Sequence, residues 1–309
     1  MKLHYGLDSL PHIQNAVVSS GTFDGVHIGH QKILRHIITL AKEINGESVL
    51  ITFWPHPRLV LHPDDDSLRL LNTFEEKTAL LHQLGIDHLI AIQFTPEFSQ
   101  LTSEQFIQQV LVNKIKTKKL VIGYDHRFGK NREGSFEYLK ANADQYGFTV
   151  EEIPAQDVED VTVSSTKIRK ALEEGNIQIA NEYLGNPYQL TGKVVRGQQI
   201  GRTIDFPTAN LSVYERYKLV PKNGVYAVQV KCGELEYRGM LNIGQRPTLN
   251  GTDRSIEVNI FDFDQDIYDS EITISFFHFI REEQKFANLE ALKEQLWQDK
   301  KYIQSIFSS

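Results

Sequence analysis

Two short segments carry residue types that could bind and activate nucleotide phosphates. The first, residues 21–30, reads Gly-Thr-Phe-Asp-Gly-Val-His-Ile-Gly-His. A strand before it and a helix after it would aim free backbone N–H groups at an anion. His27 and His30 are three residues apart, so both imidazoles can face one side of the first helical turn. There they can donate hydrogen bonds to phosphoryl oxygens and offset the charge that grows on a leaving pyrophosphate.

A second predicted helix start could add phosphate contacts. Ser164-Ser165-Thr166-Lys167-Ile168-Arg169 opens a helix, with Ser165 or Thr166 available as its N-cap. Arg169 would then lie in the first turn, where a guanidinium can bind phosphate oxygens in a bidentate way. The alternative is a plain capped helix with cations at its surface.

The second phosphate-handling segment is Phe206-Pro207-Thr208-Ala209-Asn210-Leu211. The glycines of residues 192–202 would let the preceding loop fold over phosphates through its N–H groups. Thr208 and Asn210 supply short oxygen ligands on either side of a small residue. Mg²⁺ keeps most of its waters and takes few protein ligands, so one hydroxyl and one amide oxygen suffice. Without its context the same tripeptide would be interpreted as an ordinary turn.

The elements that must position the first segment follow a β-α rhythm from about residue 16 to 155. This alternation predicts a mostly parallel sheet with helices on both faces. Ligands of such sheets bind at the carboxyl ends of the strands, where residues 21–30 and 123–132 would both lie. Strands are expected at 16–20, 48–53, 88–94, 119–123 and 148–153, and helices at 29–44, 74–84, 103–114 and 134–145.

The pattern changes after about residue 184, where Gly185-Asn186-Pro187 is a plausible linker. Closely spaced strands punctuated by Gly and Pro predict a small antiparallel barrel, and a helix at about 288–306 should pack against it through one apolar face. The two expected domains are 1–184 and 185–309. Helices are expected at 165–174 and 176–183, and strands at 188–195, 224–230, 237–243, 255–261 and 271–279.

Composition narrows the functional classes. The 309 residues include 33 Lys and Arg against 40 Asp and Glu, a net charge of −7 that argues against a nucleic-acid partner. The chain begins without an apolar signal core and has no run of membrane-spanning length. Its lone cysteine, Cys232, excludes an internal disulfide and a cysteine-based zinc cluster. These features predict a cytoplasmic protein, and they leave its oligomeric state open.

The N-terminal half contains four motifs in this order: Gly21–His30, Phe53-Trp54-Pro55-His56-Pro57, Gly123–Gly134 and Ser164–Arg169. Together they resemble the adenylyltransferase half of the bacterial bifunctional riboflavin kinase/FMN adenylyltransferase (FAD synthetase) family. The resemblance implies a Rossmann-like nucleotidylyltransferase fold, with catalysis by His27, His30 and Arg169. It implies an ATP site formed by Gly21, Phe23, Asp24, Gly25, His27, His30, Ser165, Thr166 and Arg169. It implies a flavin site formed by Phe53, Pro55, His56, Pro57, Asp125, Arg127 and Phe128.

Two histidines of this half leave an alternative open or depart from the family pattern. His56 stands between two prolines, and its alternative role is only to shape a rigid loop. His126 stands where the family more usually has Phe, which bears on the flavin contacts rather than on the ATP contacts.

Four further motifs follow the Pro-Thr-Ala-Asn segment: Gly224-Val225-Tyr226-Ala227, Asn242-Ile243-Gly244-x-x-Pro247-Thr248, Glu257-x-x-x-Phe261-Asp262-Phe263 and Arg281-x-Glu283-x-Lys285-Phe286. In this order they resemble the riboflavin kinase module of the same family. The resemblance implies a six-stranded Greek-key barrel with a C-terminal helix. It implies that Gly201, Thr208 and Asn210 bind ATP and that Thr208 and Asn210 are the ligands of Mg²⁺. It also implies that Arg281 contacts the flavin. It makes Glu257 the general base that accepts the proton of the riboflavin 5′-hydroxyl. Two residues depart from the family pattern: Asp205 replaces a usual Gly, and Asn259 replaces a common His.

The leading hypothesis is therefore an enzyme that converts riboflavin to FMN and FMN to FAD, using ATP at two separate sites. One alternative is an adenylyltransferase for another phosphorylated metabolite, with a degenerate kinase barrel. A second is a protein that senses flavin or nucleotide without turnover.

Overall fold

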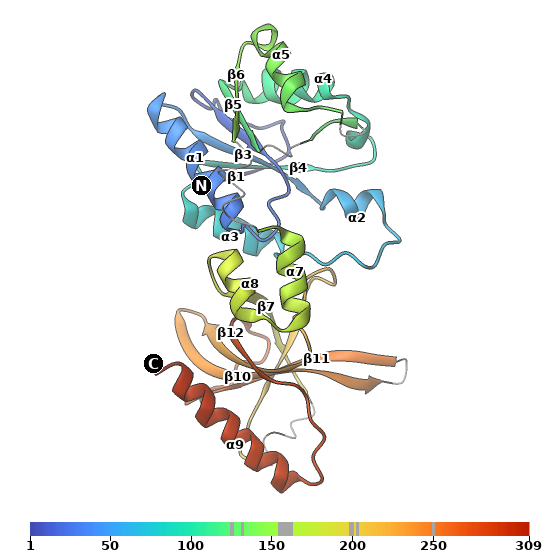
Figure 1. Ribbon diagram of the computed structural model, residues 1–309, viewed down its shortest axis with the longest axis vertical. Helices are drawn as coiled ribbons and strands as arrows, with labels where there is room; N and C mark the ends of the chain where they lie inside the picture. The colour runs from blue at the N-terminus through green and yellow to red at the C-terminus, as the bar shows by residue number, and fades with distance from the viewer. Residues whose placement is uncertain are drawn as a thin grey trace. The chain divides into compact units, whose positions relative to one another are not determined.

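The structure is a computed structural model that describes residues 1–123, 127–130, 133–153, 163–197, 201, 204–248 and 251–308. It divides into two units, Met1–Ser165 and Thr166–Ser309 (Figure 1). This division assigns residues 166–184 to the second unit. The domain boundary expected at residue 184 stays a prediction.

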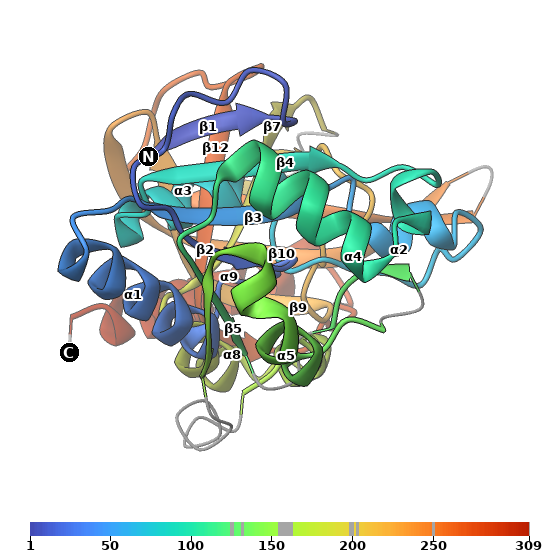
Figure 2. The same cartoon turned by 90° about the horizontal axis from the view of Figure 1, so that it is seen from above.

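The first unit is built on a six-stranded sheet in the order β1-β4-β3-β2-β5-β6. All five strand pairs are parallel, as the β-α rhythm predicts. Figure 2 shows the strands side by side in this order from β1 to β5. Their bounds are β1 Lys2–Tyr5, β2 Val17–Ser20, β3 Ser48–Trp54, β4 His88–Gln93, β5 Lys119–Gly123 and β6 Thr149–Ile153.

Helices cover both faces of this sheet because alternate strand residues are apolar on both sides. Val49 and Ile51 of β3 join the core beneath α4, η2 and α5, whereas Leu50 joins the core beneath α1 and α3. Both cores consist mainly of buried aliphatic side chains, which is typical of a doubly covered parallel sheet. The helices are α1 Ile28–Glu43, α2 Pro57–Leu61, α3 Phe74–Leu84, η1 Phe98–Gln100, α4 Ser103–Phe106, η2 Ile107–Ile115 and α5 Phe136–Tyr146.

The strand order places a topological switch point at β2. From β2 the chain runs to β3 and β4 on one side of the sheet, and then crosses over to β5 and β6 on the other. Ligands of open α/β sheets bind in the crevice that such a reversal leaves at the carboxyl ends of the strands. The segment that follows β2 is residues 21–30, so the fold puts the predicted phosphate-binding turn in this crevice.

The second unit contains a closed six-stranded barrel in the order β10-β11-β8-β7-β12-β9, with every strand pair antiparallel. The C-terminal helix α9 (Leu289–Ile306) packs on it through Ile303, which is fully buried beside Phe206 and Val225. The other elements are α7 Ser165–Glu174, α8 Ile177–Leu184, β7 Tyr188–Val195, β8 Ala209–Val213, β9 Gly224–Cys232, β10 Leu235–Thr248, β11 Gly251–Ile260 and β12 Glu271–Arg281 (Figure 1). The predicted fold class is confirmed.

Some elements differ from those expected from the sequence. The helix expected at 103–114 starts as α4 and continues as η2, which winds with the wider π geometry up to Lys116 in a left-handed conformation. Strands β1 and β8 and the short helix α2 were not expected. Strand β8 forms where only a metal-binding loop was foreseen, because its backbone pairs with both β7 and β11 and so closes the barrel.

Candidate active sites

The turn between β2 and α1 has an unusual backbone. Phe23, Gly25 and Val26 have positive φ angles of 47°, 88° and 42°. Positive φ is rare for a bulky or β-branched residue, and such strained positions cluster at ligand-binding sites. Successive residues of this kind also turn their N–H groups toward a common concave side that suits anions. The predicted ATP contacts of Gly21, Phe23 and Gly25 therefore lie in a turn with a suitable shape.

The structure brings His27 and His30 into direct contact. His27 is the N-cap of α1, and its Nδ1 accepts a hydrogen bond from the backbone N–H of His30 at 3.3 Å. The two rings stack with their centroids 3.6 Å apart. Because His27 Nδ1 acts as an acceptor, its ring proton is on Nε2. That N–H is thus the one that His27 has available for a phosphate oxygen.

Both imidazoles are held in the neutral form at pH 7. Burial lowers the pKa of His27 from 6.5 to about 4. Burial, together with the nearby His27 and Lys77, lowers the pKa of His30 well below its ordinary value. The Nδ1 atom of His30 is buried and has no hydrogen-bond partner among the residues that the structure describes. A buried polar atom without a partner is costly, and a bound ligand could satisfy it.

This burial predicts an acid-sensitive first unit. The pKa of His27 is lower in the folded than in the unfolded chain, so its neutral form contributes stability above pH 6.5 that is lost as the pH falls from 6.5 towards 4. At pH 5 we expect the loss to be about 2 kcal/mol for His27. Urea unfolding at pH 7 and pH 5, followed in wild type and in His27→Gln, measures it. The variant should lose less stability on acidification than the wild type; equal losses would contradict the assignment.

Two further residues of the predicted ATP site lie close to this turn. The carboxylate of Asp24 is buried and accepts hydrogen bonds from the N–H groups of Leu71, at 2.9 Å, and Asn72. The Ser165 hydroxyl donates to the Asp24 carbonyl oxygen at 2.9 Å. Asp24 therefore organises the turn with its carboxylate, and Ser165 joins it. Thr166 and Arg169 belong to the second unit, and their contacts with ATP stay predictions.

The predicted flavin residues divide into two groups. Phe53 and Phe128 belong to one chain of aromatic contacts that runs through Phe98 and Phe106, with ring centroids 5.6–6.3 Å apart. Such rings offer apolar faces to a planar ring system. His56 instead caps α2 by accepting from the Arg58 N–H, and Pro57 is the first residue of that helix. Pro55 precedes this cap, Arg127 is exposed, and Asp125 and His126 lie outside the described residues.

The barrel unit brings Thr208, Asn210 and Glu257 together. Glu257 on β11 is paired in register with Asn210 on β8. The Thr208 hydroxyl donates to the Glu257 carboxylate at 3.3 Å. A Cβ on Gly201 would overlap the Phe206 carbonyl oxygen, and one on Gly197 would overlap the Asn210 amide. Glycine at these two positions therefore lets the loop approach the cluster closely.

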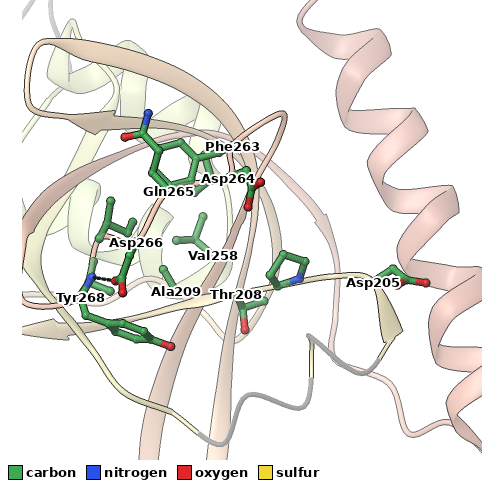
Figure 3. Close-up of a pocket in the computed structure, with 13 residues that line it drawn as sticks. Asp205, Thr208, Ala209, Val258, Phe263, Asp264, Gln265, Asp266 and Tyr268 are labelled. Carbon is green, nitrogen blue, oxygen red and sulfur yellow. Dashed lines mark hydrogen bonds between the residues drawn. The ribbon is translucent and has the colours of Figure 1, made fainter.

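A pocket opens directly beside Thr208. Its volume is about 480 Å³, within the range of small-molecule sites. Figure 3 shows Phe263 and Tyr268 on opposite sides of Val258 and Ala209, and all four residues line the pocket. None of residues 263–268, which line the pocket, was predicted as a site residue. The available signal was the run Phe-Asp-Phe-Asp at residues 261–264, directly after β11.

Both departures from the family pattern in this unit have structural partners. Asp205 adopts a φ of 61°, a left-handed conformation that suits glycine and is tolerated by Asp. Its carboxylate forms an ion pair with Lys293 of α9 at the rim of the pocket. Asn259 is buried and donates to the Pro207 carbonyl oxygen at 2.7 Å, which anchors the segment that carries Thr208.

We expect Lys293 to neutralise Asp205 when ATP binds. Replacing Lys293 with Ala should raise the KM for ATP in riboflavin phosphorylation by about two- to five-fold, the scale of an exposed ion pair. The double variant with Asp205→Gly should restore the wild-type KM, because the unpaired carboxylate is removed. Steady-state kinetics of the four proteins tests this. If the two substitutions instead had additive effects on the KM for ATP, Lys293 would not act by neutralising Asp205.

Arg281 is engaged within the protein. Its guanidinium forms a bidentate ion pair with Asp299 of α9, with nitrogen–oxygen distances of 2.8–3.2 Å. Asp299 is only 4% exposed, so this pair fastens the end of β12 to the C-terminal helix. The predicted flavin contact of Arg281 stays a prediction.

A parallel α/β unit that carries a His-x-Gly-His turn, joined in one chain to a closed barrel that carries a Thr-Asn-Glu cluster, is the architecture of a two-domain transferase. The family model described as FAD synthetase matches residues 10–167, and that described as riboflavin kinase matches residues 184–307. The chain belongs to the family of bacterial bifunctional riboflavin kinase/FMN adenylyltransferases.

Relatives match along the whole chain. The bifunctional riboflavin kinase/FMN adenylyltransferase of Haemophilus influenzae is 38% identical over 312 residues, which cover 100% of both chains. The protein of the same name from Bacillus subtilis is 38% identical and covers 95% of this chain and 93% of its own. A crystal structure described as a macrolide-efflux protein from Streptococcus pneumoniae has a TM-score of 0.88 and 32% identity, with 98% of each chain covered. No helix among the described residues has the length and apolarity needed to span a membrane.

Proposed function

We propose that this chain phosphorylates riboflavin at the Thr208–Glu257 cluster and adenylylates the resulting FMN at the His27–His30 turn. The observation that carries the proposal is that each phosphate-handling cluster lies in its own unit. Each cluster also falls within the range matched by the family model for the corresponding reaction. Riboflavin, FMN and ATP are the small-molecule substrates. The single cysteine supports a cytoplasmic location.

In adenylyl transfer, a phosphate oxygen of FMN attacks the α-phosphorus of ATP and pyrophosphate leaves. The reaction needs alignment and stabilisation of charge rather than a covalent protein nucleophile. The neutral His27 donates from Nε2, and the N–H groups of the turn add further donors. The aromatic cluster around Phe53 and Phe128 is suited to bind the flavin ring. Arg169 is proposed as a further phosphate ligand.

In phosphorylation, the riboflavin 5′-hydroxyl attacks the γ-phosphorus of ATP and ADP leaves. Glu257 takes the hydroxyl proton as general base. The hydroxyl of Thr208, the amide of Asn210 and the nearby Glu257 carboxylate form a set of hard oxygen donors that fits Mg²⁺. Thr208 and Asn210 would hold the ion, which would neutralise phosphate charge. The pocket lined by Phe263 and Tyr268 is proposed to receive ATP.

The product spectrum of the purified chain tests this function. With riboflavin, ATP and Mg²⁺ we expect FMN to accumulate first and FAD to follow. With FMN and ATP we expect FAD and pyrophosphate. A chain that forms FAD from FMN but never phosphorylates riboflavin would retain only the first site. Absence of both products would overturn the proposal.

A further inference from the structure

Lys77 is a buried lysine beneath the phosphate-binding turn that the reaction described above does not use. It lies in the first turn of α3, which begins at the capping box formed by Thr73 and Glu76. Only 6% of its surface is exposed. Its ammonium donates to the Thr22 carbonyl oxygen at 3.2 Å and to the Thr52 hydroxyl at 3.0 Å.

The partners of this ammonium are neutral. Besides the two oxygens, Lys77 Nζ lies 5.7 Å from the ring centroids of both Trp54 and Phe74. Within the described part of the chain, no carboxylate lies within ion-pair distance of it, although the charge of Asp24 acts on it from further away. Burying a charge without an ion-pair partner costs free energy, which is usually accepted where the charge serves a ligand.

The two hydrogen bonds join the two predicted substrate segments. Thr22 belongs to the turn that leads to His27 and His30. Thr52 belongs to β3, which ends at Trp54 just before the predicted flavin loop. Lys77 therefore fixes the ATP-side turn to the flavin-side strand, and it places a positive charge under the point where both substrates would bring phosphates.

We propose that Lys77 is a positioning residue for adenylyl transfer. Its hydrogen bonds fix the Thr22 carbonyl and the Thr52 hydroxyl relative to each other, and its positive charge stabilises the bound phosphates of ATP and FMN. This inference rests on the proposed adenylyl transfer at the His27–His30 turn. A 1 Å misplacement of reacting groups can reduce a rate by about 100-fold. Loss of Lys77 should therefore act mainly on turnover rather than on substrate binding alone.

Charged and titratable groups around Lys77 define its pH dependence. They are Asp24 in the turn, His30 on α1 and Glu76 on its own helix, while β3 contributes the neutral Thr52. Burial lowers the pKa of Lys77 from 10.5 to about 8, and the opposing effect of Asp24 is smaller. Its charge is therefore present below pH 8 and lost above it. The wild-type rate of FAD formation should fall as the pH rises through 8.

The test compares Lys77→Met and Lys77→Arg with wild type. We expect Lys77→Met to lower kcat for FAD formation from FMN by about 10- to 100-fold at pH 7. Lys77→Arg should recover part of that loss, and its rate should stay level from pH 8 to pH 10 because a guanidinium remains charged. Thermal unfolding of each variant is the control for folding of the first unit, and riboflavin phosphorylation by the same preparations is the control for the second unit. Lys218→Met, which removes a buried lysine of the second unit, should leave FAD formation unchanged.

Several results would overturn the role of Lys77. One is wild-type kcat in Lys77→Met. Another is an equal decrease of kcat in Lys77→Met and Lys77→Arg, accompanied by an equal decrease of thermal stability, which would make Lys77 a packing residue. The pH profile of the wild type needs no variant, and a rate that stays constant from pH 7 to pH 9.5 would also overturn it. A wild-type chain that forms no FAD at all would instead refute the underlying function.

Discussion

Replacing His30 with Ala should lower the rate of FAD formation from FMN and ATP by about 100- to 1,000-fold, the typical effect of removing a preorganised donor at an active site. Formation of FMN from riboflavin should stay within about two-fold of wild type, because Thr208 and Glu257 belong to the other unit. The reason is that Ala removes the imidazole that stacks on His27 and whose buried Nδ1 lacks a partner among the described residues, whereas the backbone N–H that bonds to His27 Nδ1 stays. Separate initial-rate assays with FMN and with riboflavin measure the two effects.

His36 provides the matched control for this experiment. It lies on the same helix, 40% exposed, and pairs with Glu151 on β6 rather than with the turn. His36→Ala should leave both rates unchanged. If His30→Ala reduced both activities equally, or if His36→Ala were as damaging as His30→Ala, the turn would not be a separate adenylyl-transfer site.

The second large effect is expected at Glu257. Glu257→Gln keeps the shape and a hydrogen-bonding oxygen but removes the base, so riboflavin phosphorylation should fall by about 100- to 10,000-fold. Adenylylation of added FMN should continue at the wild-type rate. Thr208 still finds an acceptor in the amide oxygen, so the barrel should remain folded. Assays of ADP release with riboflavin and of FAD formation with FMN measure both.

Glu236 is the corresponding control in the barrel. It is exposed on β10 and pairs with Gln229. Glu236→Gln should retain full phosphorylation. A Glu257→Gln variant that phosphorylates riboflavin at more than a tenth of the wild-type rate would remove Glu257 as general base. If Thr208 and Asn210 still held the metal ion, another residue of the same pocket would then have to act as the general base.

The sequence predicts the elements whose signal is local. Strands such as β3, with seven consecutive residues that include a buried aliphatic run, and the amphipathic helices α1 and α9 are found close to their expected positions. Strand β8 was missed because it has only five residues and follows directly on the Phe206-Pro207-Thr208 segment, and it is stabilised by pairing with β7 and β11. Strand β1 was missed because it is short and lies at the exposed edge of the sheet.

The candidate sites divide in the same way. His27 and His30 lie within one helical turn, so their spacing alone predicts their proximity. Lys77 is 55 positions from Thr22, and a lysine in a helix pattern is normally interpreted as a surface residue. Only the packing of α3 against the turn brings the two residues together. The ion pair of Lys293 with Asp205 joins residues 88 positions apart, so it likewise depends on the fold.

Independent operation of the two sites can be measured directly by mixing the two single-site variants. His30→Ala and Glu257→Gln each convert little riboflavin to FAD alone, the first because it stops at FMN and the second because it never forms FMN. An equimolar mixture supplied with riboflavin, ATP and Mg²⁺ should restore FAD formation, since FMN released by one variant is the substrate of the other. FAD production that stays at the level of the separate variants, while each retains its remaining activity, would contradict two independent sites.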